Sequence, residues 1–124
     1  MRILLDTWAI LELIKGSDKG AKVDEIVRES TLTCTTCLNL YEAKYKLAGW
    51  YGGERINKML DEVRATTQIL SITEEAALEA AEIKLQQKQL SAVDCNSYAT
   101  AKLHKLEFVT GDKGFEGLGG VVLV

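Results

Sequence analysis

The chain has 124 residues, a length typical of one domain that can bury a genuine core. Its formal charge of −3 at pH 7 argues against a general polyanion-binding protein, so any contact with nucleic acid must depend on local basic groups. No apolar run approaches membrane-spanning length, and Asp6 interrupts the apolar start before a secretory signal can form. We therefore expect residues 1–124 to form one domain with no membrane partner.

Three cysteines without a secretory context predict a reducing, cytoplasmic location and free thiols. Cys34 and Cys37 have the C-x-x-C spacing that zinc sites and redox pairs use. A structural zinc needs four ligands, and only Cys95 and His104 remain as further soft candidates. We therefore favour small, partly buried thiols, with a redox pair at a strand-to-helix junction as the alternative.

Short apolar runs alternate with amphipathic segments along the chain. Strands are predicted at residues 3–5, 31–35, 68–72, 107–110 and 121–124, and helices at 8–14, 21–28, 36–49, around 56–63, 73–88 and 91–103. The strand runs are continuously apolar, which argues for a parallel sheet covered on both faces. We predict an α/β fold with a parallel sheet of four to five strands and helices on both faces.

Two of the predicted helices have apolar stripes at helical spacing, and we expect these stripes to face the core. The inward residues are predicted to be Leu38, Tyr41, Tyr45 and Ala48 in the helix after Thr36, and Tyr98, Ala101 and Leu103 in the helix at 91–103.

Four acidic residues occupy positions where the chain leaves a strand or runs beside a buried stripe. Asp6 follows the first strand, Asp112 follows the fourth strand, Asp94 lies in the first turn of a helix, and Glu42 lies beside the stripe of another. Open α/β sheets bind their ligands beyond the carboxyl ends of the strands. If the first and fourth strands are neighbours, Asp6 and Asp112 meet above the sheet, where Asp94 and Glu42 can close the crevice from the helix side.

Each acid also has a local explanation that involves no ligand. Asp is a favoured helix N-cap, which accounts for Asp6. Asp94 comes three residues after Ser91, the spacing of a capping box, and Gly-Asp at residue 112 is ordinary turn chemistry. A glutamate at the edge of a helix stripe, such as Glu42, commonly reaches out to water.

Taken together, the acids predict a metal site. Like charges in one cleft cannot all stay ionised unless a cation neutralises them. Ligand sets made only of oxygen favour hard ions, here Mg²⁺ or Mn²⁺, and such ions retain water molecules. Metal-held water can attack a phosphodiester while the ion stabilises charge on the phosphate. The predicted chemistry is metal-assisted hydrolysis of a phosphate ester.

Four short motifs lie in order over the full length of the chain: Leu-Asp-Thr at 5–7, Tyr-Glu-Ala at 41–43, Ser-Ala-Val-Asp at 91–94 and Thr-Gly-Asp-Lys-Gly-Phe at 110–115. In these motifs the chain resembles the PIN domain. More narrowly, it resembles the VapC-type toxins of bacterial and archaeal toxin–antitoxin pairs.

The resemblance implies a PIN-like three-layer sandwich and a ribonuclease that uses Mg²⁺ or Mn²⁺. It also implies a homodimer, an RNA substrate and a cognate antitoxin that holds the enzyme inactive. The implied metal-binding and catalytic residues are Asp6, Glu42, Asp94 and Asp112, with Thr110 and Thr7 in support and Lys113 as an RNA-backbone contact.

One departure from the family pattern follows the third acid. Residues after it are usually small and apolar, but here they are Cys95, Asn96 and Ser97. Either Asn96 or Ser97 can therefore add a polar contact at that helix start, and the sequence does not choose between them.

Three alternatives to this interpretation need to be considered. A phosphatase of the haloacid-dehalogenase type needs a second Asp two positions after the first, where this chain has Trp8. A different metal-dependent phosphoesterase stays open. A non-catalytic α/β binding module is the other alternative, and it predicts that the four carboxylates lie far apart.

Overall fold

The computed structural model describes residues 1–124. Its elements follow in the order β1 (Arg2–Leu5), α1 (Thr7–Lys15), α2 (Asp18–Glu29), β2 (Leu32–Thr36), α3 (Cys37–Leu47), α4 (Gly53–Thr66), β3 (Gln68–Leu70), α5 (Glu74–Gln86), α6 (Ala92–Leu103), β4 (Glu107–Thr110), the short 3₁₀ helix η1 (Lys113–Phe115) and β5 (Val121–Leu123).

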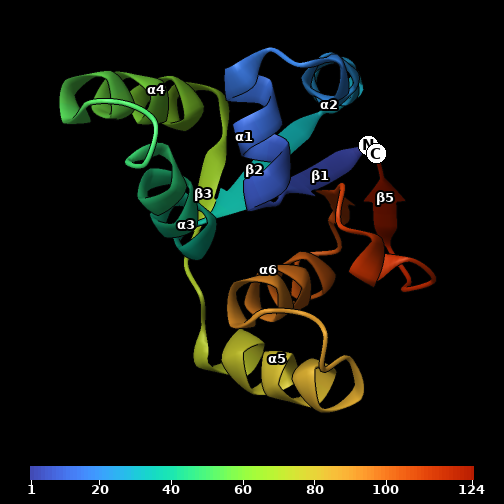
Figure 1. Cartoon of the computed structure of the whole chain (residues 1–124). Helices are drawn as coiled ribbons and strands as arrows, with labels where there is room; N and C mark the ends of the chain where they lie inside the picture. Colours follow the sequence, from blue (N-terminus) through green and yellow to red (C-terminus); the bar gives the residue numbers. More distant parts are fainter.

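The five strands form one parallel sheet in the order β3-β2-β1-β4-β5 (Figure 1). Strand β1 lies in the middle, where Leu4 pairs with Cys34 of β2 on one side and with Phe108 of β4 on the other. The predicted parallel sheet is confirmed. Its first and fourth strands are direct neighbours, which is the condition for Asp6 and Asp112 to meet.

Helices cover both faces of the sheet, so the molecule has three layers (Figure 1). Successive residues of a strand point to opposite faces. Leu4 of β1 accordingly belongs to the core beneath α5 and α6, whereas Ile3 and Leu5 belong to the core formed with α1 to α4. Because β1 is buried on both faces, its apolar run does not alternate with polar residues.

The predicted inward stripe of α3 is wrong at Tyr41, Tyr45 and Ala48, all three of which are exposed. Tyr41 and Tyr45 are 63% and 73% exposed, and their rings stack against each other with centroids 6.5 Å apart. The buried side of α3 instead carries Asn39, Ala43 and Leu47. The helix is turned this way because the polar Asn39 side chain is satisfied by hydrogen bonds inside the protein, as described below.

Other predictions differ at the ends of elements. Leu103 ends α6 and is 40% exposed, although an inward position was predicted. The last strand was expected to be buried, but β5 forms the edge of the sheet and Leu123 is 40% exposed. Helix α2 begins at Asp18 rather than residue 21 because the Ser17 hydroxyl caps it, accepting a hydrogen bond from the Gly20 amide at 2.9 Å.

The three cysteines are free thiols, as predicted. Cys34 and Cys95 are buried, Cys37 is exposed, and none of the three is in a disulfide. None of the helices combines the length and apolar character needed to cross a membrane.

Candidate functional site

Asp6 lies at the carboxyl end of the central strand. Its backbone amide donates to the Val109 carbonyl of β4 at 3.1 Å, which extends the pairing of β1 with β4 by one bond. Its carboxylate accepts a hydrogen bond from the Ala9 amide at 2.8 Å and so caps α1. The residue is only 2% exposed. An ionisable carboxylate is therefore held at the position where open α/β sheets bind ligands.

Thr110 joins Asp6 to the loop that carries Asp112. Thr110 ends β4 and is fully buried. Its hydroxyl accepts a hydrogen bond from the Asp112 backbone amide at 3.0 Å and lies near the Asp6 carboxylate, whose pKa it lowers. One hydroxyl at the end of β4 thus holds the start of the Asp112 loop and lies beside Asp6.

Gly111 lets the Asp112 loop pass close to α1. A Cβ atom on Gly111 would lie 2.4 Å from the ring of Trp8, well inside van der Waals contact. The half-buried indole of Trp8 therefore packs directly on the backbone between Thr110 and Asp112. Nothing in the sequence motifs indicates this packing role of Trp8, since the contact joins residues about a hundred positions apart.

The environment of Asp6 disfavours its charge. Burial raises the pKa of Asp6 from 3.8 to about 7. Hydrogen bonds from Thr110 and Ala9 oppose this shift, whereas the negative charges of Asp94 and Asp112 add to it. The structure thus holds a carboxylate whose charge is not compensated by any cation of the protein.

Asp94 is coupled to the same group of charges from the helix side. Ser91 caps α6 and accepts a hydrogen bond from the Asp94 amide at 3.1 Å. Burial is the main cause that raises the pKa of Asp94, the Ser91 hydroxyl lowers it, and repulsion from Asp112 and Glu42 raises it further. Through its repulsion of Asp94, Glu42, which is half-buried on α3, belongs to the same group of interacting acids.

The four acids share one electrostatic neighbourhood, yet they do not form a closed coordination shell. No three acidic, cysteine or histidine side chains are grouped tightly enough to hold one ion. Local capping operates as well, because Asp112 accepts a hydrogen bond from the Gly114 amide at 2.8 Å in η1. Capping and mutual repulsion therefore act on the same aspartates.

The donor chemistry fits a hard divalent cation. All candidate ligands are carboxylate or hydroxyl oxygens, which Mg²⁺ and Mn²⁺ prefer. Burial is the main cause that raises the pKa values of Asp6 and Asp94, and a positive charge would relieve both this cost and the smaller repulsion between the acids. The Glu42 side chain is half-buried and that of Asp112 is exposed.

The remaining predicted residues lie around this centre in different ways. The Thr7 hydroxyl is buried and accepts a hydrogen bond from the side-chain amide of Asn39 at 3.1 Å. Lys113 is exposed in η1, directly after Asp112. Of the two open candidates after Asp94, Ser97 hydrogen-bonds to Asn39 at 2.9 Å, whereas Asn96 donates to a carbonyl of its own helix.

Sequence reasoning did not single out Asn39, which is fully buried. It occupies the third position of α3 in a capping box with Thr36, whose hydroxyl accepts a hydrogen bond from the Asn39 amide at 3.2 Å. Thr followed three residues later by Asn is the signal that could have found it.

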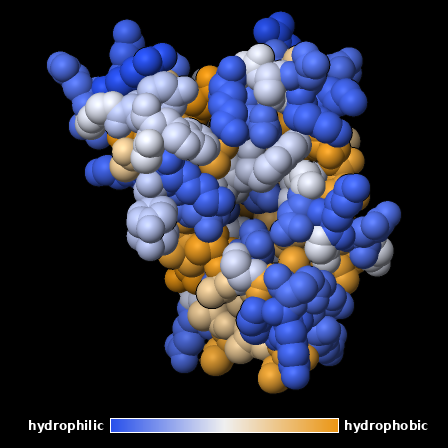
Figure 2. Space-filling view, in the orientation of Figure 1, coloured by the Kyte–Doolittle hydropathy of each residue, from blue (hydrophilic) through white to orange (hydrophobic).

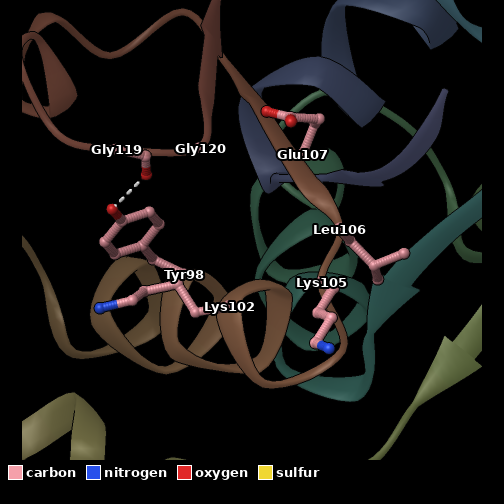
Figure 3. Close-up of a pocket in the computed structure, with 7 residues that line it drawn as sticks. All are labelled: Tyr98, Lys102, Lys105, Leu106, Glu107, Gly119 and Gly120. Atoms are coloured by element: carbon pink, nitrogen blue, oxygen red, sulfur yellow. Dashed lines mark hydrogen bonds between the residues drawn. The ribbon is translucent and has the colours of Figure 1, made fainter.

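A separate pocket of about 450 Å³ lies at the opposite end of β4. Glu107, which begins β4, lines it together with Lys102 and Lys105 (Figure 3). On its other side the Tyr98 hydroxyl donates to the carbonyl of Gly119 (Figure 3). Because Thr110 ends the same strand at the acidic centre, this pocket takes no part in that site.

Comparison with protein families identifies one match: the model described as PIN domain covers residues 3–121. A comparison with curated proteins finds no match.

Several solved structures share the fold. A toxin–antitoxin complex from Klebsiella pneumoniae aligns with a TM-score of 0.77 at 23% identity, covering 97% of this chain and 95% of that chain. VapBC2 from Rickettsia felis, bound to a DNA fragment from its promoter, gives 0.79 at 16% identity over 100% and 98%. VapC20 from Mycobacterium tuberculosis, a toxin that cleaves the sarcin–ricin loop, gives 0.77 at 17% identity over 94% and 95%.

Proposed function

The chain belongs to the PIN domain family, whose members are nucleases, and on this premise we propose that it is an endoribonuclease dependent on Mg²⁺ or Mn²⁺. We further propose that it is the VapC-type toxin of a toxin–antitoxin pair. The residues assigned to the metal are Asp6, Glu42, Asp94 and Asp112.

The observation that supports this assignment is the mutual repulsion of the acids at the carboxyl ends of β1 and β4. Asp94 and Asp112 both raise the pKa of Asp6, and Glu42 adds to the repulsion at Asp94. Helix capping does not require the acids to lie near one another, because each cap is complete by itself. A bound cation would offset the repulsion between the acids that this arrangement creates.

The chain's own residues supply position and orientation. A bound divalent ion would supply Lewis acidity, stabilising charge on the phosphate and making water a better nucleophile. Asp6 is fixed by the Ala9 amide and the Thr110 hydroxyl, so its carboxylate does not need to be reorganised during the reaction. Lys113 is exposed beside Asp112 and can hold the phosphate backbone of the RNA.

The test is cleavage of a mixed RNA pool in Mn²⁺, with wild type beside Asp112→Asn. We expect cleavage that needs both the metal and Asp112. Asp61→Asn is the matched control, because this aspartate lies on α4 in an exposed ion pair with Arg64. If the wild type cleaves no RNA and calorimetry detects no Mn²⁺ binding to it, the non-catalytic binding module replaces this proposal.

This chain has a groove between α1 and α4 that could bind an antitoxin. A groove of about 330 Å³ is lined by Leu13 and Ile14 of α1 and by Met59 of α4, with Arg55, Lys58 and Glu62 at its rim. Apolar grooves with a polar rim accept amphipathic helices. Because similar folds occur in toxin–antitoxin complexes, we assign this groove to a helix of the cognate antitoxin.

The proposed homodimer uses α5. Leu78 and Leu85 are 65% and 67% exposed and lie two helical turns apart on one side of α5. Hydrophobic surface gathers between α3 and α5 in Figure 2. Exposed apolar patches of this kind mark interaction sites, so we place a second copy of the chain against this side.

A further inference from the structure

Asn39 is the centre of a buried hydrogen-bond network beside the acids. It is 0% exposed, and its side-chain amide makes four hydrogen bonds. Its oxygen accepts from the Thr36 hydroxyl at 2.7 Å, the Ser97 hydroxyl at 2.9 Å and the Thr36 backbone amide at 3.3 Å. Its nitrogen donates to the Thr7 hydroxyl at 3.1 Å. The amide thus connects α1, the end of β2, α3 and α6.

Three members of this network lie one or three residues from a proposed metal ligand. The pairs are Thr7 with Asp6, Asn39 with Glu42, and Ser97 with Asp94. Side chains three apart on a helix are neighbours, so a shift of α3 or α6 at the network moves the corresponding acid. The network therefore joins the three elements that carry these acids through one side chain.

Packing alone does not require a polar group here. The network itself is buried: Thr36, Asn39 and Ser97 are each 0% exposed. An apolar side chain would fill such a position without the need to satisfy an amide on both of its ends. A fully satisfied polar network fixes one arrangement, because each donor and acceptor must keep its direction.

We infer that Asn39 is the positioning residue of the acidic centre, fixing how the elements that carry Asp6, Glu42 and Asp94 are placed relative to one another, and thereby the affinity of these acids for a divalent ion. This inference rests on the proposed function. Asn39 does not touch the ion or the RNA; it acts through the residues that carry the ligands. Groups that orient metal ligands in this way commonly change metal affinity 10- to 100-fold when they are removed.

The experiment measures Mn²⁺ affinity by calorimetry for wild type and Asn39→Leu, which retains the volume and removes the amide. We expect at least about tenfold weaker binding, together with a loss of kcat greater than any change in KM. Leu47→Ala is the control, since Leu47 lies in the core on the same helix and makes no hydrogen bond to the network. It should lower stability and leave Mn²⁺ affinity unchanged.

Ser97→Ala serves if Asn39→Leu does not fold, because it removes one hydrogen bond of the network and a single oxygen atom. We expect a smaller but measurable weakening of Mn²⁺ binding in this variant. Wild-type affinity in every folded network variant would overturn the inference while leaving the proposed function intact. Absence of Mn²⁺ binding to the wild type would instead remove the proposed metal site, and the inference with it.

Discussion

The backbone amide of Asp6 donates a hydrogen bond to the carbonyl of Val109 at 3.1 Å. This contact continues the β1–β4 register, in which Leu5 pairs with Val109, by one residue past the last paired position of β1. Asp6 therefore lies beside Thr110 and the loop to Asp112 because of backbone geometry, whatever its side chain is. Side-chain changes at position 6 can be made without moving the strand ends.

We expect Asp6→Asn to abolish cleavage and to stabilise the metal-free protein above pH 7. Asp6 has a pKa of about 7 when folded and about 3.8 when unfolded. Between these values the folded state binds the extra proton, so wild-type stability falls as pH rises, and the full penalty is present above pH 7. The difference between the two pKa values corresponds to at most about 4 kcal/mol.

Denaturant unfolding in EDTA at pH 4 to 8 checks this expectation. Asn keeps the cap of α1, so the stability difference between Asp6→Asn and wild type should grow from near zero at pH 4 and level off above pH 7. Asp6→Ala should gain less, because it also loses the hydrogen bond to the Ala9 amide, worth about 1 kcal/mol. A pH-independent difference would contradict the assigned pKa.

Thr110→Val should raise the pKa of Asp6 above its wild-type value. The Thr110 hydroxyl stabilises the ionised carboxylate, and valine has the same shape without the hydrogen bond. The variant should also lose about 1–3 kcal/mol of stability, because the Asp112 amide loses its acceptor. A carboxyl ¹³C titration by NMR measures the pKa. Thr110→Ser retains the hydroxyl and should titrate like the wild type.

Gly111→Ala should destabilise the protein by about 1–3 kcal/mol and reduce cleavage, because the new methyl group meets the Trp8 ring. A double-mutant cycle with Trp8→Ala checks the cause. If the contact is responsible, Gly111→Ala should be much less harmful when Trp8 is already replaced, a coupling of at least about 0.5 kcal/mol. Strictly additive free energies of unfolding would exclude the clash.

Met59→Lys should weaken binding of the antitoxin at least tenfold while leaving RNA cleavage by the free protein intact. The substitution places a charge in the groove between α1 and α4, away from the acids. Surface plasmon resonance with the co-expressed antitoxin gives the affinity. Leu78→Lys, on α5, is the control and should bind the antitoxin normally; equal losses in both variants would argue against the groove.

Replacing both Leu78 and Leu85 with Lys should convert the proposed dimer to a monomer, since the new positive charges on α5 of the two copies would then face each other across the interface. Light scattering at micromolar concentration gives the mass. A wild type that is already monomeric at this concentration would refute the α5 interface.

The sequence was informative at several positions where local chemistry decided the outcome. The apolar run of residues 3–5 predicted a buried strand, and the capping preferences of Thr36 and Ser91 predicted where α3 and α6 begin. The order of these elements predicted the parallel sheet. It also placed Asp6 and Asp112 at neighbouring strand ends once β1 and β4 were assumed to pair.

What the sequence could not reveal depends on how the helices are turned. Periodicity placed Tyr41 and Tyr45 inside, because apolar spacing carries no information about a polar residue that is satisfied internally. Two partners of Asn39, Thr7 and Ser97, come from distant parts of the chain, and Ser97 could not be preferred over Asn96 without knowing this contact. The contact of Trp8 with Gly111 likewise exists only in the folded molecule.

The strand order also has a consequence for synthesis of the protein. β1 is made first, yet β4, its partner at the acidic centre, follows about a hundred residues later. Domains commonly form during translation as their segments emerge from the ribosome. On a nascent chain, Asp6 therefore has neither Thr110 nor Asp112 beside it until about a hundred further residues have been made. The acidic centre is therefore complete only after β4 and the loop that follows it have emerged from the ribosome.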